Sequence, residues 1–298
     1  MSHALAAALG KLVEREGTVA ASNFTPAQRR ALEELGRKTG ALRVKSEGRG
    51  SVYQIVHPAM LAAHLRTLRP LHADEIDPDL PKRSANIGQS RNSKGGDSSH
   101  AKHYLLVKAV ATGAVWKIHN KGVERELDLF ASTEISGAGV LALEERDTWR
   151  SEQPLWLVEN QALFDRLDWM PLEAVGTVAY YAGQLPARLL KWLADSPRAS
   201  EVILFPDYDG VGILNYARLL EVCASPCSFW LMPKWRERLL AYGSHEIWKN
   251  TQSDFQSALS RLDFPKFDKG IAELCAALST EGLALEHEAV WLPVIDQD

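Results

Sequence analysis

Cysteine and long apolar segments are both scarce in this chain of 298 residues. Its 3 cysteines are too few to form the disulfide framework typical of small secreted domains. No apolar run reaches the roughly 18 residues that a membrane span requires. The N-terminal segment also lacks a charged region followed by a continuous apolar stretch, so it does not look like a signal peptide. We therefore expect a reduced, cytoplasmic protein without a membrane segment.

The composition has no signature of disorder either. Hydrophobic residues make up 46% and charged residues 24%, which is ordinary for a globular protein, and the length favours two domains. Charge is divided unevenly: residues 1–130 hold 20 Lys and Arg against 13 Asp and Glu, whereas residues 131–298 hold 14 against 25. A basic part suits contact with a polyanion and an acidic part suits a cation site, although solvated surface charge would give the same division.

Residues 1–70 have the pattern of a winged-helix module. Helical periodicity covers residues 3–16, and a second helix is expected to begin with Thr25 as N-cap and Pro26 as first residue and to end at Gly40. Two short strands follow, joined by a basic loop. Such a module binds DNA or mediates protein contacts. The basic side chains that could face DNA phosphates are Arg29, Arg30, Arg43, Lys45 and Arg49.

Residues 71–150 are predicted to form a basic loop and an intermediate region of unspecified fold. The composition of residues 82–100, rich in Gly, Ser and Asn, indicates an exposed loop. This loop is either simply mobile or wraps a nucleic-acid backbone with Arg83, Arg91 and Lys94. Residues 104–110 and 139–143 have the apolar character of strands.

Residues 151–298 change to a pattern of short apolar strands alternating with helical segments. This alternation predicts an α/β fold, in which a parallel sheet is flanked by helices and followed by further helices beyond residue 233. The continuous apolar character of each strand fits burial on both faces. The expected strands are residues 155–158, 177–181, 201–205 and 228–232.

Acidic residues follow two of these strands directly. Glu159 follows the first strand, and Asp207 and Asp209 follow the third, in the string FPDYDGVGIL. Ligands collect at the carboxyl ends of parallel strands, and converging carboxylates suit a hard divalent cation. The three acids therefore predict a metal site, since buried acids without a cation would repel one another.

Glu after the first strand and Asp-x-Asp-Gly after the third resemble the signature of Toprim domains, which occur in topoisomerases, primases and nucleases. The string VAYYAGQLPARLLKWL is similar to the Gly-x-x-Pro turn and helix of type IIB topoisomerase A subunits. Gly183 and Pro186 match that motif, and Lys191 stands where the family has Arg. The whole arrangement resembles JetD-like (MksG) nucleases of SMC-type (Wadjet, condensin-like) plasmid-defence systems. The likeness is specific over residues 154–231 and rests on architecture before residue 150.

The resemblance implies a metal-dependent DNA endonuclease that hydrolyses phosphodiester bonds in plasmid or phage defence. Mg²⁺ (or Mn²⁺) would be held by Glu159, Asp207 and Asp209, with Lys191 as a further catalytic residue. Glu159 could instead be the base for the attacking water. Expected partners are double-stranded plasmid DNA, an SMC-like ATPase complex and a second copy of the chain.

Other interpretations stay open on the sequence alone. Glu286 and Glu288, on either side of His287, form either a second metal site or an exposed pair on a strand. A type IIB-like transesterase would need a nucleophilic tyrosine in the N-terminal module. Tyr53 is the only tyrosine there and lacks the Arg context of that family, so we expect it to pack in the core. A non-catalytic DNA-binding scaffold is the remaining alternative.

Overall fold

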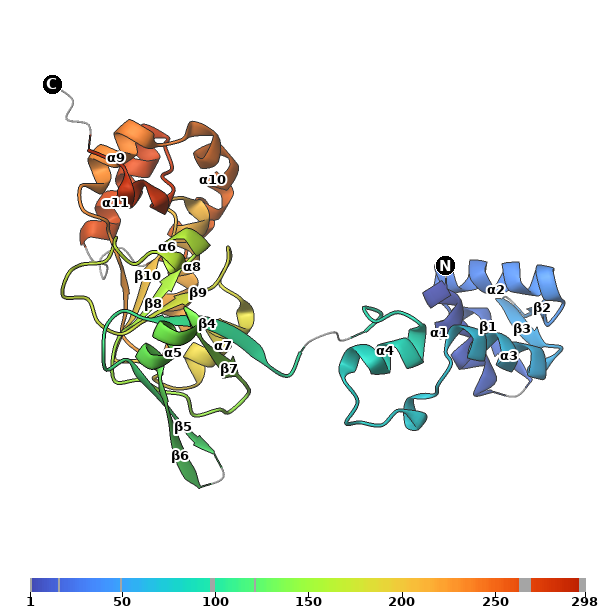
Figure 1. Ribbon diagram of the computed structural model, residues 1–298. Helices are drawn as coiled ribbons and strands as arrows, with labels where there is room; N and C mark the ends of the chain where they lie inside the picture. The colour runs from blue at the N-terminus through green and yellow to red at the C-terminus, as the bar shows by residue number, and fades with distance from the viewer. Residues whose placement is uncertain are drawn as a thin grey trace. The chain divides into compact units, whose positions relative to one another are not determined.

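The computed structural model describes residues 2–15, 17–48, 50–96, 100–120, 122–262 and 269–294. The chain divides into two compact units, Met1–His100 (the N-terminal unit) and Ala101–Asp298 (the C-terminal unit), each with its own buried core (Figure 1). Arg49, one of the predicted DNA contacts, lies outside the described residues. No described helix is both long and apolar enough to cross a membrane.

The N-terminal unit combines helices with a small antiparallel sheet of order β1-β3-β2. The two predicted helices and the predicted hairpin are present, and the structure adds a first strand and further helices. The elements are α1 (Ser2–Val13), β1 (Thr18–Ala20), η1 (Ala21–Asn23), α2 (Pro26–Thr39), β2 (Leu42–Glu47), β3 (Gly50–Ile55), α3 (Pro58–Leu68), η2 (Ala73–Glu75) and α4 (Lys82–Ser90).

The ends of α2 follow the predicted local signals. Thr25 and Gln28 form a reciprocal capping box, with Pro26 as the first helical residue. Gly40 ends the helix with φ of 67°, a left-handed conformation that glycine adopts without strain. These boundaries were predictable because each depends on side chains within a few residues of the helix end.

Helix α4 corrects the first half of the predicted exposed loop over residues 82–100, whereas the described residues 91–96 are irregular and mostly exposed. The Asn86 side chain is buried, and its amide donates a hydrogen bond to the carbonyl oxygen of Ser93, 3.0 Å away. Leu71 donates its backbone N–H to the carbonyl oxygen of Gly88. The polar segment is therefore helical because it packs against the preceding chain, a contact that composition does not reveal.

The C-terminal unit is built on a six-stranded sheet of order β11-β10-β8-β9-β4-β7. Strands β8, β9, β10 and β11 run parallel to one another. Strand β4 runs antiparallel to both of its neighbours, β9 and β7. The α/β class is confirmed, but the sheet is mixed instead of wholly parallel. The strands are β4 (His103–Ala109), β7 (Gly139–Leu143), β8 (Leu155–Val158), β9 (Thr177–Tyr180), β10 (Val202–Phe205) and β11 (Cys227–Phe229).

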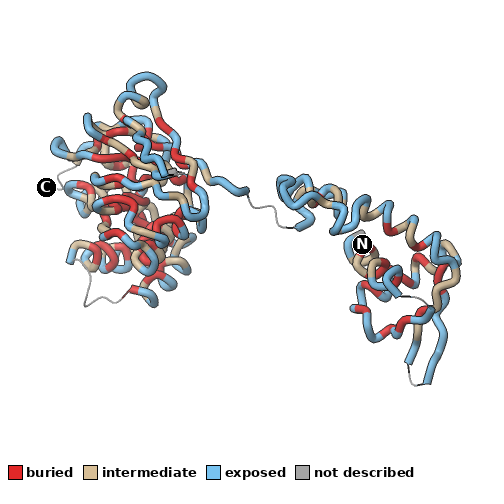
Figure 2. The backbone as a smooth tube through the Cα atoms, turned by 90° about the horizontal axis from the view of Figure 1, so that it is seen from below, coloured by how far each residue is buried: buried red, intermediate tan, exposed pale blue. Residues whose placement is uncertain are grey.

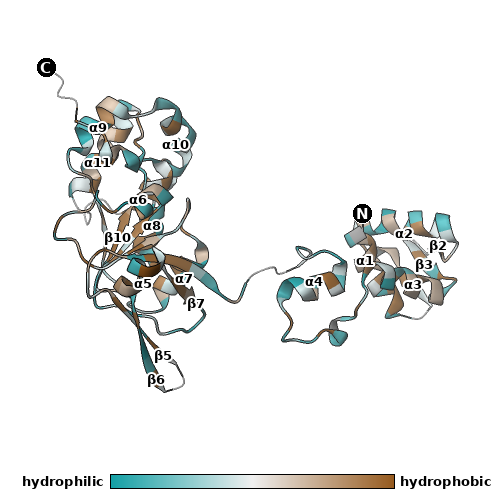
Figure 3. Ribbon diagram, viewed as in Figure 1, coloured by the Kyte–Doolittle hydropathy of each residue, from teal (hydrophilic) through white to brown (hydrophobic). Residues whose placement is uncertain are grey.

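The boundary predicted at residue 150 is also wrong, because β4 and β7 belong to this same sheet. Leu106 pairs with Tyr180 and Leu105 with Leu141, so the predicted intermediate region of residues 71–150 is divided between the two units. Leu105, Val107 and Leu141 are buried in the same core as β8 to β10. Figure 2 shows the buried residues in red at the centre of this unit, and Figure 3 shows its central strands as hydrophobic.

Helices cover the sheet and continue past it. In Figure 1, α9, α10 and α11 gather at one end of the C-terminal unit, while the hairpin of β5 and β6 extends from the other. The remaining elements are β5 (Val115–Asn120), β6 (Val123–Asp128), α5 (Leu129–Ser136), α6 (Gln161–Asp165), α7 (Ala187–Asp195), α8 (Gly210–Val222), α9 (Trp235–Tyr242), α10 (His245–Leu259), α11 (Lys269–Glu281) and η4 (His287–Trp291).

Candidate metal centre

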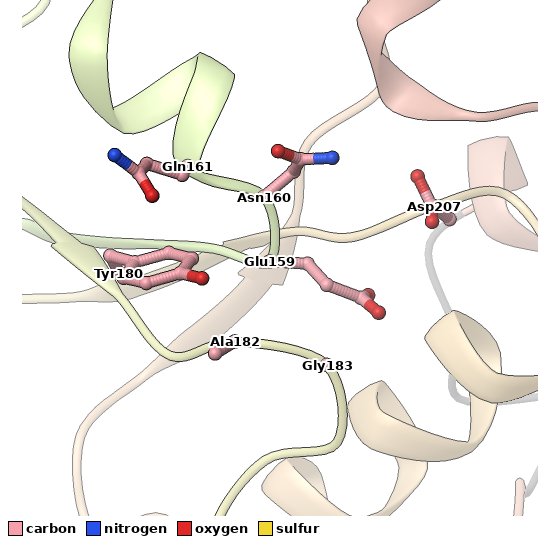
Figure 4. A pocket seen from close by; sticks show the side chains of 7 residues that line it. All are labelled: Glu159, Asn160, Gln161, Tyr180, Ala182, Gly183 and Asp207. Atoms are coloured by element: carbon pink, nitrogen blue, oxygen red, sulfur yellow. The ribbon is translucent and has the colours of Figure 1, made fainter.

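A cavity of about 290 Å³ lies beside the carboxyl ends of β8, β9 and β10. Glu159 lines it from the end of β8, and Asp207 lines it from the loop after β10 (Figure 4). Strands β8 and β10 are direct neighbours in the sheet. This is the edge of a parallel sheet where ligands are expected to bind. The lining residues are Glu159, Asn160, Gln161, Tyr180, Ala182, Gly183 and Asp207.

Glu159 is held in a strongly perturbed electrostatic environment. Burial, followed by the negative charges of Asp207 and Asp209, raises the pKa of Glu159 to about 8. The Tyr181 hydroxyl donates a hydrogen bond to Glu159 Oε2 at 3.2 Å, which opposes this rise. Without a cation, Glu159 therefore retains its proton at neutral pH.

Asp207 lies next to the C-terminal segment of the chain. The His287 backbone N–H donates a hydrogen bond to Asp207 Oδ1 at 2.9 Å, and Tyr208 pairs antiparallel with Leu285. Burial raises the pKa of Asp207 to about 6, while the hydrogen bond from His287 lowers it. A segment 80 residues away along the chain thus fixes one of the predicted ligands in place.

Asp209 has a structural task in addition to any role in metal binding. Its side chain caps α8, because Oδ1 accepts a hydrogen bond from the Gly212 backbone N–H at 2.7 Å. Burial raises its pKa to about 6. A Cβ atom at Gly212 would lie 1.9 Å from the carbonyl oxygen of Asp207, so only glycine allows this tight turn.

The predicted acids Glu159, Asp207 and Asp209 lie near enough to interact, because the negative charges of Asp207 and Asp209 both raise the pKa of Glu159. Among the described residues, the group whose ligand atoms all lie within 4.8 Å of one another is Asp207, His287 and Glu288.

Glu286 and Glu288 have different surroundings in the structure. Glu288 joins Asp207, whereas Glu286 is exposed and acts on Asp207 only through its charge. The two residues flank His287 at the start of η4, so the alternative of an exposed pair on a strand is wrong. The sequence analysis did not name His287 as a site residue. Its position between Glu286 and Glu288 is the sequence feature that could have marked it as a candidate metal ligand.

Lys191 and the predicted DNA contacts lie outside the cavity. Lys191 is on an exposed face of α7 and forms an ion pair with Glu145. Gly183 lines the cavity with φ of 75°, and Pro186 is the N-cap of α7. The described residues predicted to contact DNA are all exposed and belong to the N-terminal unit: Arg29, Arg30, Arg43, Lys45, Arg83, Arg91 and Lys94.

Tyr53 has the packing role that the sequence predicted. It is 1% exposed, and its ring meets that of Phe24 edge to face with centroids 5.4 Å apart. Its hydroxyl donates a hydrogen bond to Glu33 at 3.3 Å, and burial raises its pKa to about 12. A phenol in this environment is poorly activated as a nucleophile.

A scan of the sequence against protein-family models finds no match, and a search among curated proteins finds no similar sequence. The function is therefore argued from the geometry of the site and from the motifs that carry it.

Proposed function

We propose that this chain is a divalent-cation-dependent DNA endonuclease with an N-terminal winged-helix module and a C-terminal Toprim domain. The observation that carries the proposal is the placement of Glu159 and Asp207 at the ends of adjacent parallel strands, facing one cavity. Their raised pKa values reflect buried charge of one sign that a cation would neutralise.

The donor set fits Mg²⁺ or Mn²⁺. Carboxylate oxygens of Glu159, Asp207 and Asp209 are hard ligands, and these residues come from two neighbouring strand ends. When bound, the cation would stabilise negative charge on the scissile phosphate and on the leaving oxygen. Glu159 either contributes a ligand or accepts a proton from the attacking water, while the Tyr181 hydroxyl orients its carboxyl group.

The proposed substrate is double-stranded DNA, and the exposed basic residues of the N-terminal unit support it. The motif resemblance adds a homodimer and an SMC-like ATPase complex as proposed partners, in plasmid or phage defence. Burial of Tyr53 favours water over tyrosine as the nucleophile. A catalytic role for Lys191 rests on the motif resemblance alone, since Lys191 does not line the cavity and its ammonium group pairs with Glu145.

Plasmid nicking in Mg²⁺ and in Mn²⁺ tests the proposal, for the full chain alone and together with an SMC-like ATPase complex. We expect wild type to cut and Asp207→Asn to lose at least 100-fold in rate, since the variant keeps the side-chain shape but removes the charge. Glu145→Gln, which alters an exposed acid of the same unit, should cut like wild type.

Two outcomes would contradict the nuclease. Equal cleavage by wild type and Asp207→Asn would exclude this site as the catalytic centre. Binding of DNA by both proteins without cleavage under any of these conditions would indicate the non-catalytic scaffold instead.

A further inference from the structure

The imidazole of His287 is an unusual buried polar group. Its side chain is 0% exposed, and within the described parts of the chain neither Nδ1 nor Nε2 has a hydrogen-bond partner of acceptable geometry. Buried polar atoms are almost always paired, so an unpaired ring requires an explanation, and an unseen ion is one. The neighbouring ring is that of Phe205, at a centroid distance of 5.2 Å.

Two carboxylates face this ring. Asp207 Oδ1 lies 3.4 Å from Nδ1, and Glu288 Oε2 lies 3.7 Å from Nε2. These distances exceed a hydrogen bond, yet one ligand atom from each of the three residues falls within 4.8 Å of the others. An ion here would take one of the two ring nitrogens and one oxygen from each carboxylate, since the carboxylates lie beside different nitrogens of the ring.

Both carboxylates are held by hydrogen bonds from groups other than the three ligand side chains. Glu288 accepts a hydrogen bond from the Asn160 side-chain amide, and Asn160 also caps α6 through its oxygen. Asp207 accepts the backbone N–H of His287. Such outer hydrogen bonds orient the ligands of protein metal sites before the ion binds. The backbone of Phe205 and Pro206 also lies near the His287 ring, but among the described residues it makes no hydrogen bond of acceptable geometry to either ring nitrogen.

We propose that Asp207, His287 and Glu288 form a second divalent-cation site that prefers Mn²⁺, or a similar first-row transition ion, over Mg²⁺. The preference follows from the imidazole nitrogen, because Mg²⁺ favours oxygen ligands whereas Mn²⁺ and the later transition ions accept nitrogen. The site shares Asp207 with the acids of the cavity and so deepens the proposed function, but the binding of the ion does not depend on DNA cleavage.

Mn²⁺ binding to the full chain tests this site without an activity assay. In excess Mg²⁺, electron paramagnetic resonance should still report one bound Mn²⁺ per chain, with a ¹⁴N coupling from the imidazole. His287→Gln should abolish that coupling and weaken Mn²⁺ binding at least tenfold. Glu288→Gln should weaken binding to a similar extent, whereas Glu281→Gln, at an exposed position at the end of α11, should stay within twofold of wild type.

The wild-type spectrum keeps the test decisive even if a variant fails to fold. Bound Mn²⁺ without ¹⁴N coupling, or Mn²⁺ that Mg²⁺ displaces at equal concentration, would overturn the proposal. Coupled Mn²⁺ in a protein that does not cut DNA would retain the metal site and reject the nuclease. Cleavage of DNA by a protein whose bound Mn²⁺ shows no ¹⁴N coupling would retain the nuclease and reject this metal site.

Discussion

At the scale of single residues, Glu159 shows how burial and like charge reshape one carboxyl group. Its pKa is raised to about 8, above the ordinary value of 4.5, so the folded protein binds a proton that the unfolded chain releases between these two values. Because the unfolded state then binds fewer protons, the free energy of unfolding falls as pH rises through this window.

We therefore predict that, in EDTA, the protein loses stability between pH 5 and pH 8 and that Glu159→Gln reduces this loss. The variant should be more stable than wild type at pH 8 by roughly 1–3 kcal/mol, since it removes a buried carboxylate charge. Urea denaturation at the two pH values measures the difference. An identical decline in both proteins would show that Glu159 is not the titrating group.

Asp209 illustrates why a carboxylate motif cannot be assigned from its letters alone. Its oxygen caps α8, a role that Asp often fills at helix starts, and its charge also raises the pKa of Glu159. The structure shows the capping role of Asp209, and metal binding by the same side chain belongs to the proposed function.

At the scale of elements, a buried ion pair joins the connections that precede β8 and β10. Arg198 and Asp147 have side chains only 1% and 6% exposed, with Nη1 and Oδ1 3.1 Å apart. The Arg198 guanidinium also donates hydrogen bonds to the carbonyl oxygens of Trp149 and Trp192. Loss of this one side chain would leave Asp147 buried without its cation.

We predict that Arg198→Met lowers the free energy of unfolding by about 3–5 kcal/mol, as expected when one partner of a buried pair is removed. Lys102→Met, which breaks an exposed pair with Glu144, should leave the free energy of unfolding almost unchanged. Urea denaturation compares the two variants. A loss for Arg198→Met no larger than that for Lys102→Met would mean that the buried pair is not stabilising.

Elements that depend on their own residues were predicted correctly, whereas elements that depend on contacts with other segments were missed. Residues 155–158 were predicted as a strand and form β8 unchanged, because an unbroken apolar run fits burial on both faces. Helix α4 was missed because its polar residues become helical only through contacts such as that of Asn86 with Ser93. The hairpin of β5 and β6 was missed as well.

At the scale of the whole molecule, the excess of basic charge belongs to the unit that does not hold the acidic cavity: residues 1–100 contain 15 Lys and Arg against 10 Asp and Glu, and residues 101–298 contain 19 against 28. Arg43 and Lys45 stand two residues apart on β2, so both lie on the same side of that strand. If this unit grips DNA, they contact phosphates without reading sequence.

We predict that Arg43→Gln combined with Lys45→Gln weakens DNA binding by the full chain. It should also make the slope of log affinity against log salt shallower by roughly 2, one for each lost phosphate contact. Fluorescence anisotropy across a salt series measures both. Lys38→Gln, at a residue already paired with Glu34, is the matched control. An unchanged slope in the double variant would argue that this module contacts protein instead.

By itself, the sequence determined the α/β class, most of the strands, the ends of α2 and the candidate acids at the strand ends. All of these depend on apolar periodicity or on neighbours a few residues apart. Only the tertiary structure decided that β4 and β7 complete the sheet, that Lys191 turns to Glu145, and that Glu288 and not Glu286 meets Asp207. Pairing between distant segments settles these features, and the bridge from Tyr208 to Leu285, which brings His287 to the acids, leaves no periodic trace in the sequence.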